Sequence, residues 1–316
     1  MTKLHEDALR IVEMMRTSGR PPFEEMQPGA ARTVYAAGRD VLQPPRAEVA
    51  EMRDLAIPGP AGDIKLRLYR GIGTEAEANL PCLVFLHGGG WVVGDLESHD
   101  GICRRLANEA ACRVVAVDYR LAPEHRFPAA VDDAAAAWRA VFAHAAEWRI
   151  DPARVAVGGD SAGGNLAAVL ALMGRDGTVP APVFQVLIYP VTDLVMTGES
   201  YERVLDGVPL TARTMRWFAD HYTPDPAMRV DWRASPLRAP SLAGVAPAFV
   251  VTVSHDPLCD EGREYARRLE REGVAVSALH ISDQPHGMFT MGAIIRPADL
   301  ATRLVGDVLR AALHPA

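Results

Sequence analysis

A serine between glycines is the strongest chemical signal in the sequence. Residues 159–163 read Gly-Asp-Ser-Ala-Gly, after the apolar run VAVG (155–158) and at the start of a helical run. A strand, a GxSxG turn and a helix in this order are typical of a nucleophile elbow, a tight turn that presents the serine at a sheet edge. The glycines leave room for neighbouring elements, and Ser161 is expected to have a strained backbone. The pattern predicts Ser161 as a nucleophile, with the Ala162 amide at the positive end of a helix.

A second glycine run, His87-Gly88-Gly89-Gly90-Trp91, follows the apolar run LVFL (83–86). Consecutive glycines let backbone N–H groups approach a substrate oxygen closely. The chain contains neither GxxxxGK[ST] nor GxGxxG, which disfavours a nucleotide site. No second ligand lies at helical or strand spacing from His87, which disfavours a metal site. The run is interpreted as a source of donors for a developing oxyanion.

A serine hydroxyl is a poor nucleophile at neutral pH and needs a base, which in turn needs an acid to orient it. Of the ten histidines, His286 lies in a Pro/Gly loop after the last predicted strand, where a catalytic histidine is expected. His255 is its rival. Asp256 closely follows the predicted strand FVVTV and is the preferred acid, with Asp193 as the main rival.

Short apolar runs alternate with helical segments along most of the chain, which predicts a parallel sheet with helices on both faces. An antiparallel pair is expected at 49–57 and 64–69. Further strands are expected at 83–87, 114–118, 155–158, 184–189, 249–253 and 274–281, and helices near 5–17, 98–111, 128–147, 162–174, 260–272 and 297–312.

One interval of about 60 residues, between Tyr189 and Phe249, breaks this rhythm. It has helical texture at 201–208 and 211–221 and is too long for one crossover helix. It is interpreted as an insertion carried on the sheet, and we expect it to pair with the N-terminal helix. The stretch 21–45 is rich in Pro, Gly and Ala and shows no strand pattern.

Composition narrows the class of protein. The 316 residues are 49% hydrophobic and 23% charged with a net charge of −7, which argues against disorder and against a nucleic-acid partner. The four cysteines form no CxxC pair, and Cys82 and Cys112 are expected as core thiols. No apolar run is long enough for a secretory signal or a membrane span, so we expect a cytoplasmic protein without stable membrane insertion.

Two further groups of polar residues are given structural roles. The segment 118–130 (DYRLAPEHRFPAA) carries Asp118, Arg120 and Glu124, whose charges are expected to pair with each other and to position the 87–91 loop. Asp160 and Asn165 flank the nucleophile and are expected to hold the turn and the start of its helix.

Taken together, five motifs resemble the hormone-sensitive lipase family, and more narrowly its bacterial esterase branch with the GDSAGG elbow. They are HGGGW (87–91), DYRLAPEHRFPAA, GDSAGGN (159–165), DPLCDEG (256–262) and PHGM (285–288). The resemblance covers residues 50–312 and implies an α/β-hydrolase fold, with a mostly parallel eight-stranded sheet and a helical cap. The expected division is N-terminal cap helices at 1–48, core at 49–192, cap insertion at 193–236 and core at 237–316.

The resemblance also implies roles for particular residues. The oxyanion hole would use the amides of Gly89, Gly90 and Ala162, with Gly88 as the supporting turn. Trp91 and Met288 are the candidates for substrate contact. Cys259 departs from the family, where arginine is frequent, and is expected to pack rather than react.

The implied activity is that of a serine carboxylic-ester hydrolase acting on short-to-medium acyl esters through an acyl-serine, without metal or organic cofactor. A lactonase or an arylformamidase with the same triad is left open. A non-catalytic receptor is disfavoured because all three triad candidates are present, and a peptidase of the prolyl-oligopeptidase type because the chain has no room for a propeller. The expected partner is a small ester, and a homodimer is left open because composition does not decide how edge strands pair.

Overall fold

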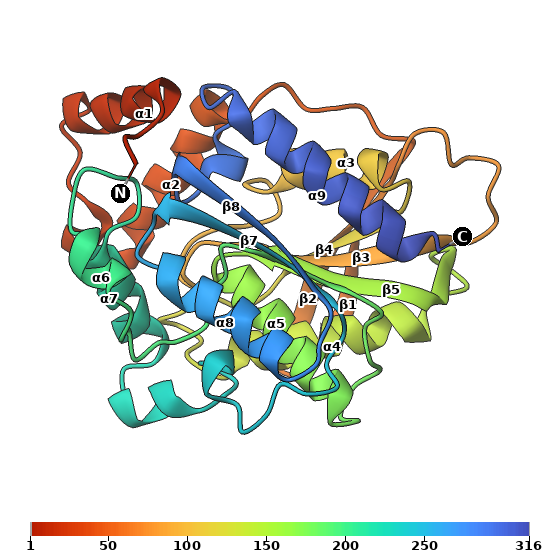
Figure 1. The fold of residues 1–316 in the computed structure, drawn as a ribbon. Coiled ribbons are helices and arrows are strands. Elements are labelled where there is room, and N and C mark those ends of the chain that lie inside the picture. The colour runs from red at the N-terminus through yellow and green to blue at the C-terminus, as the bar shows by residue number, and fades with distance from the viewer. Residues whose placement is uncertain (1, 316) are drawn as a thin grey trace.

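The computed structural model describes residues 2–315, which form one eight-stranded sheet covered by helices (Figure 1). The strand order is β1-β2-β4-β3-β5-β6-β7-β8, with β2 antiparallel to its neighbours and the later strands parallel. The strands are β1 (Glu51–Gly59), β2 (Gly62–Arg70), β3 (Leu80–Leu86), β4 (Arg113–Asp118), β5 (Ile150–Asp160), β6 (Gln185–Ile188), β7 (Ala248–His255) and β8 (Val276–Pro285). The predicted α/β-hydrolase sheet is therefore confirmed.

Helices cover both faces of this sheet, because its central strands are apolar on both sides. Every residue of β3 is buried, as a strand between two helical layers requires. Helices α3 and α9 pack together on one face, and α4, α5 and α8 cover the other (Figure 1). The helices are α1 (Glu6–Thr17), α2 (Pro28–Leu42), α3 (Asp100–Glu109), α4 (Ala129–Ala143), α5 (Ala162–Arg175), α6 (Ser200–Arg203), α7 (Ala212–Tyr222), α8 (Cys259–Arg271) and α9 (Pro297–Leu313), with 3-10 turns η1 (Phe23–Glu25), η2 (Pro226–Val230), η3 (Pro236–Arg238) and η4 (Met288–Thr290). Within residues 2–315, no helix has the length and apolar character that a bilayer crossing requires.

Strand register brings the predicted site residues to one edge of the sheet. Leu86 on β3 pairs with Gly159 on β5, so the 87–91 loop and the serine turn leave neighbouring strands at the same level. On the other side, His255 at the end of β7 pairs with Pro285 at the end of β8. Because these strands are parallel, the residues that follow them emerge side by side.

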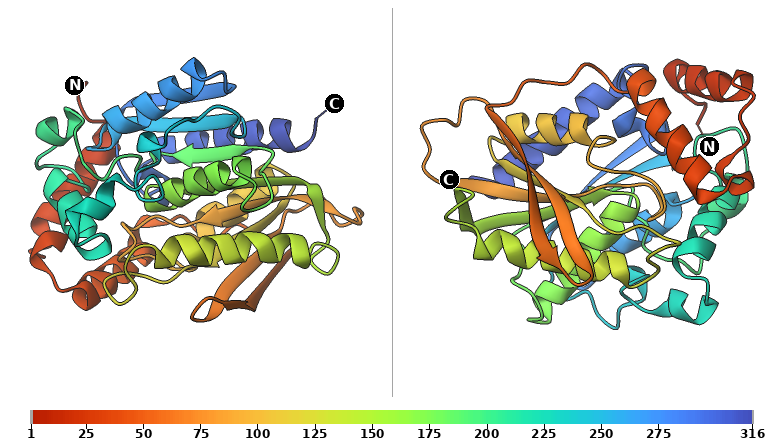
Figure 2. Two further views of the ribbon diagram at one scale, coloured as in Figure 1. Left: turned by 90° about the horizontal axis from the view of Figure 1, so that it is seen from below. Right: turned by 180° about the vertical axis from the view of Figure 1, so that it is seen from behind.

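The N-terminal helices and the insertion lie together beyond this edge (Figure 2). The Phe23 ring contacts the rings of Trp217 and Phe218 on α7, with centroids 6.5 and 6.3 Å apart. The hydroxyl of Thr214 donates a 2.8 Å hydrogen bond to Glu24. These contacts come from η1, so the expected pairing of the insertion with the helix at 5–17 is wrong.

That first helix, α1, is instead anchored to the C-terminal part of the chain. The guanidinium of Arg296 donates to the buried carboxylate of Asp7 at 2.9 Å, and the amide of His5 donates to the carbonyl of Asp283. Arg296 also holds the pKa of Asp7 below its usual value by hydrogen bonding. The helix thus packs beside the loop that follows β8.

Two local expectations are corrected. The helical texture at 201–208 yields only the single turn α6, because the chain leaves the helical conformation at Val204 (φ −113°, ψ 69°) and Gly207, with φ +70°, does not resume it. The stretch 21–45, where the sequence showed no strand pattern and gave no helix bounds, contains α2. Its Pro28 occupies the first turn of the helix, where a missing N–H costs nothing.

Hydrogen bonds join the two ends of the insertion to each other. Arg238 donates to both carboxylate oxygens of Asp193 at 2.6 and 2.9 Å, and the amide of Leu237 donates to the carbonyl of Thr192. From α5, the side-chain amide of Asn165 donates to the carbonyls of Val191 and Ala234. Asn165 therefore joins the two ends of the insertion to α5. This role is additional to the support of the helix start that the sequence predicted.

We expect Arg238→Met to lower the free energy of unfolding by about 3 kcal/mol, because it leaves the buried Asp193 carboxylate without its cation. Hydrogen exchange should accelerate within residues 193–238. Arg303→Met, which removes an exposed pair with Asp299, is the matched control and should cost about 0.3–0.5 kcal/mol. Equal effects of the two variants in denaturant titrations would contradict the stabilising role of the pair between Arg238 and Asp193.

Candidate active site

The turn that carries Ser161 is held against β3 by contacts that only glycine permits. A Cβ atom at Gly163 would lie 1.8 Å from the Leu86 carbonyl oxygen, and one at Gly159 would lie 2.4 Å from the same oxygen. Ser161 itself has φ +56° and ψ −117°, a strained conformation for a residue with a side chain. The GxSxG spacing thus follows from close packing, and it places Ser161 directly before the first turn of α5.

The structure brings the three predicted residues into one hydrogen-bonded line. Nε2 of His286 lies 2.9 Å from Oγ of Ser161, and Nδ1 lies 2.7 Å from Oδ2 of Asp256. The other carboxylate oxygen of Asp256 accepts a hydrogen bond from the amide of Leu258 at 2.9 Å. Asp256 is fully buried, whereas Ser161 and His286 keep exposed fractions of 5% and 8%. This arrangement can pass a proton from the hydroxyl to the imidazole while the carboxylate fixes the ring.

The two rival residues lie outside this line of hydrogen bonds. Asp193 is engaged by Arg238 at the base of the insertion. His255 ends β7, and burial lowers the pKa of its imidazole. The line of hydrogen bonds to Ser161 passes through neither residue.

The amides that the family resemblance assigned to an oxyanion hole surround the serine turn. Among residues 2–315, none accepts a hydrogen bond from the amides of Gly89, Gly90 or Ala162. The Gly88 amide, by contrast, donates to Oδ1 of Asp160 at 2.9 Å. Gly89 and Gly90 have φ of +119° and +58°, which glycine adopts without strain. The geometry therefore leaves three amides available and uses the fourth as a support.

Side chains of α7 pack directly on this donor loop. A Cβ atom at Gly90 would lie 2.2 Å from the Phe218 ring, and the Trp91 ring stacks on Tyr222 with centroids 4.2 Å apart. Trp91 and Met288 are fully buried, so the structure places both in packing contacts. Their contact with substrate stays a prediction.

The 118–130 segment packs against the start of the donor loop through Tyr119. The Tyr119 hydroxyl donates to the His87 carbonyl at 2.6 Å, and the two rings stack 4.3 Å apart. Its charges, however, do not pair with each other as expected. Arg120 binds Asp133 on α4, and Glu124 binds Arg32 on α2. The expected charge pairing is wrong because each partner comes from a different helix.

His87 remains a neutral structural residue. Burial lowers the pKa of its imidazole to about 4, and Nδ1 lies 2.8 Å from the carbonyl of Gly88. In the part of the chain that the structure describes, no group of three His, Cys, Asp or Glu side chains could hold a metal ion.

Sequence reasoning missed Tyr189, the residue after β6. Its ring centroid lies 4.3 Å from that of His286, and its backbone has φ +34°. Its buried hydroxyl has no hydrogen-bond partner among residues 2–315. An aromatic residue at the end of an apolar run is typical of a core position, so no sequence signal separates it from packing. The ring restricts how the imidazole can turn.

The chain is similar to known proteins over the segments that carry this geometry. A family model described as alpha/beta hydrolase fold matches residues 83–290. The carboxylic ester hydrolase LipN of Mycobacterium tuberculosis is 42% identical over 290 residues, 90% of this chain and 76% of that protein. Ethyl acetate hydrolase of Pseudomonas putida is 39% identical over 305 residues, 96% of both chains. A solved Ser161Ala mutant of LAE6, an alpha/beta hydrolase enzyme from the metagenome of Lake Arreo, Spain, is 39% identical over 98% of both chains, with a TM-score of 0.94.

Cys259 lies three residues after Asp256, at the start of α8. Burial raises the pKa of its thiol to about 11, with the carboxylate of Asp256 as a further cause. The other three cysteines are also buried. The protonated, covered thiol is therefore expected to pack rather than react.

We expect the native protein to expose no thiol that reacts with Ellman's reagent within minutes at pH 8, since the reactive thiolate is suppressed at every cysteine. After unfolding in guanidinium chloride, four thiols should react. Rapid labelling of Cys259 in the native state, identified by peptide mass spectrometry, would contradict this assignment.

Proposed function

Because the chain belongs to the hormone-sensitive lipase family of alpha/beta hydrolases and is a carboxylesterase, we propose that Ser161, His286 and Asp256 are its catalytic triad. The observation that carries this proposal is the line of hydrogen bonds from Ser161 Oγ through the His286 imidazole to Asp256, at 2.9 and 2.7 Å. These distances suit direct proton transfer between the hydroxyl and Nε2.

In the first half of the reaction, Ser161 Oγ attacks the ester carbonyl carbon while His286 Nε2 takes the hydroxyl proton. The carbonyl electrons move to oxygen, and the amides of Gly89, Gly90 and Ala162 hold the oxyanion. When the tetrahedral intermediate collapses, the bond to the leaving oxygen breaks and His286 protonates the departing alcohol. An acyl-serine remains. Each donor of such a hole is worth roughly 2.7–4 kcal/mol of transition-state stabilisation.

In the second half, water takes the place of the alcohol. His286 removes a proton from the water as its oxygen attacks the acyl carbon, and the same amides hold the second oxyanion. Collapse breaks the bond to Ser161 Oγ, which regains its proton from His286, and a carboxylic acid leaves. Asp256 keeps the imidazole in the tautomer that presents Nε2 to the serine and stabilises the imidazolium.

The substrates we propose are short-to-medium acyl esters. Ser161 is nearly covered, and Phe218 of the cap lies against Gly90, which limits the room above the nucleophile. The name of one relative, ethyl acetate hydrolase, denotes a two-carbon acyl ester and supports this size. Lactones and arylformamides would use the same attack and serve as alternative substrates in the assay.

We expect wild-type enzyme to hydrolyse p-nitrophenyl acetate and butyrate far faster than the palmitate ester, with octanoate between them. Ser161→Ala should lose at least about 10³-fold in kcat, because no acyl-serine can form. Mass spectrometry of enzyme quenched during turnover should show the acyl group on Ser161. Undiminished turnover by Ser161→Ala would refute the nucleophile, and fastest turnover of palmitate would refute the size limit.

Asp256→Asn should leave the fold intact and reduce kcat by about 10⁴-fold, because an asparagine amide favours the wrong imidazole tautomer. Asp193→Asn is the matched control, since Asp193 pairs with Arg238 away from His286. It should retain most of kcat at temperatures where it stays folded. A larger loss of kcat in Asp193→Asn than in Asp256→Asn would reverse the assignment of the acid.

A further inference from the structure

A second line of buried polar groups lies directly behind the donor loop. Oδ1 of Asp160, the residue before the nucleophile, accepts the Gly88 amide at 2.9 Å and lies 3.1 Å from Nε2 of His99. On the other side of that ring, Nδ1 lies 2.9 Å from Oγ of Ser98. Asp160, His99 and Ser98 are all buried, with exposed fractions of 5%, 2% and 4%. This second line of aspartate, histidine and serine does not include the nucleophile.

The hydrogen bonds around Ser98 determine what Nδ1 must do. The Ser98 hydroxyl lies 2.8 Å from the carbonyl oxygen of Asp95, which can only accept, and it also accepts the Asp95 amide at 2.9 Å. The hydroxyl has one proton. If that proton goes to the Asp95 carbonyl, Nδ1 of His99 must be the donor in its contact with Ser98.

The carboxylate determines what Nε2 must do. An unprotonated Nε2 could accept a hydrogen bond from the Gly88 amide 3.3 Å away. Its lone pair would, however, also face the carboxylate oxygen Oδ1 of Asp160 at 3.1 Å, which is repulsive. A protonated Nε2 donates to the carboxylate instead. With protons on both nitrogens of His99, the Ser98 hydroxyl can donate to the Asp95 carbonyl while the ring donates to Ser98 and to Asp160.

We propose that His99 is a buried imidazolium, and that its ion pair with Asp160 positions the Gly88 amide and thereby the donor amides of Gly89 and Gly90. This inference rests on the proposed function, because it concerns the oxyanion hole of the same site. His99 and Asp160 are positioning residues: they act through Gly88, not on the substrate.

The surroundings fit a charged pair. Burial would raise the pKa of Asp160, but the charge and hydrogen bond of His99 outweigh it, and the pKa is lowered. The ring of His87, whose pKa burial lowers to about 4, lies 5.6 Å from that of His99 and brings no second positive charge there. A buried carboxylate next to a buried imidazolium also avoids an isolated charge in a site with little water.

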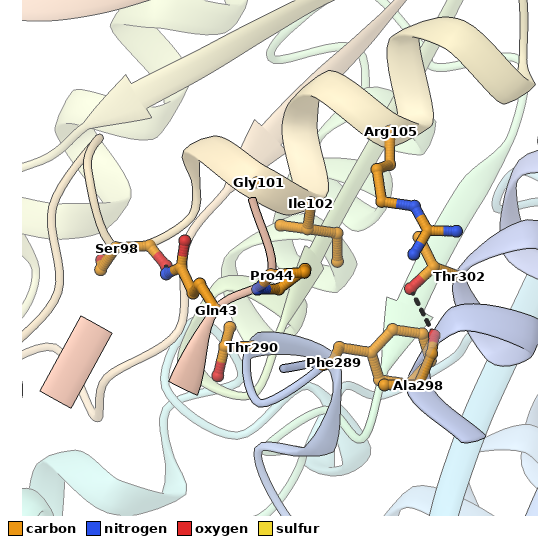
Figure 3. Close-up of a pocket in the computed structure, with 11 residues that line it drawn as sticks. Gln43, Pro44, Ser98, Gly101, Ile102, Arg105, Phe289, Thr290, Ala298 and Thr302 are labelled. Atoms are coloured by element: carbon orange, nitrogen blue, oxygen red, sulfur yellow. Dashed lines mark hydrogen bonds between the residues drawn. The ribbon is translucent and has the colours of Figure 1, made fainter. Parts of the chain in front are cut away.

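Close packing makes the pair rigid enough to position a loop. A Cβ atom at Gly88 would lie 2.4 Å from Oδ2 of Asp160, so the loop and the carboxylate are already in contact. Behind Ser98, the side-chain amide of Gln43 donates to the Ser98 carbonyl (Figure 3). The cavity beside them measures about 20 Å³, space for about one water molecule. Large movement of the Ser98–His99 turn is therefore blocked from this side.

The first test locates the protons in the unmodified enzyme. Neutron crystallography of the wild-type protein should show deuterium on both ring nitrogens of His99 and none on Asp160. A His99 ring with one deuterium would overturn the proposal. This result does not depend on whether any variant folds.

The second test uses His99→Gln, which can still donate to Asp160 but has no charge, and Asp160→Asn, which removes the opposite charge. With p-nitrophenyl butyrate, each should lose roughly 10- to 100-fold in kcat, because small misplacements of donor amides are costly, while KM changes less than about threefold. An alkyl trifluoromethyl ketone is a second probe, because Ser161 Oγ adds to its carbonyl carbon and the carbonyl oxygen becomes an oxyanion. Each variant should bind this ketone roughly 10- to 100-fold more weakly than wild type. His144→Gln, at a half-exposed histidine at the C-terminal end of α4, is the matched control and should behave as wild type.

The outcomes separate this inference from the proposed function. If Ser161→Ala is inactive but His99→Gln keeps the wild-type kcat and ketone affinity, the positioning role is overturned and the triad stands. If Ser161→Ala remains active, the proposed function fails and the positioning role fails with it. If His99→Gln only lowers Tm while kcat and ketone affinity are unchanged at permissive temperature, the pair is merely structural and the proposal is overturned.

Discussion

The approach of the serine turn to β3 is the constraint on which the rest of the site depends. The Leu86 carbonyl is so close to residues 159 and 163 that neither could carry a side chain. This contact fixes the height of Ser161 relative to the loop that follows Leu86. Since that loop supplies the candidate oxyanion donors, the distance between nucleophile and donors is set by backbone packing, not by flexible side chains.

Helix α7 is connected to this assembly and does not simply cover it. Phe218 lies against Gly90, and Tyr222 stacks on Trp91, so α7 packs on the same loop that β3 positions. On its other side, α7 contacts Phe23 from the N-terminal segment. A change that shifts α7 is therefore expected to move the backbone amides of this loop as well.

Local patterns predicted most of the sheet and the residues of the candidate triad, because apolar runs and the GxSxG and HGGG motifs are short and contiguous. The role of Tyr189 could not be predicted. Its ring contacts the His286 imidazole only in the folded protein, because the two residues are almost 100 positions apart in the sequence. The same limit explains the wrong pairing expected in 118–130, where Arg120 and Glu124 meet Asp133 and Arg32. The segment containing α2 showed no strand pattern. In the structure, Arg32 of α2 binds residues later in the chain, among them Glu124, and a local pattern does not reveal such contacts.

The ion pair between Asp7 and Arg296 has a consequence for biosynthesis. These residues are 289 positions apart, so α1 leaves the ribosome long before its partner exists. At about 5–20 residues per second, the delay is roughly 15–60 s. His286 follows Ser161 by 125 positions, so the candidate nucleophile is also synthesised well before its candidate base.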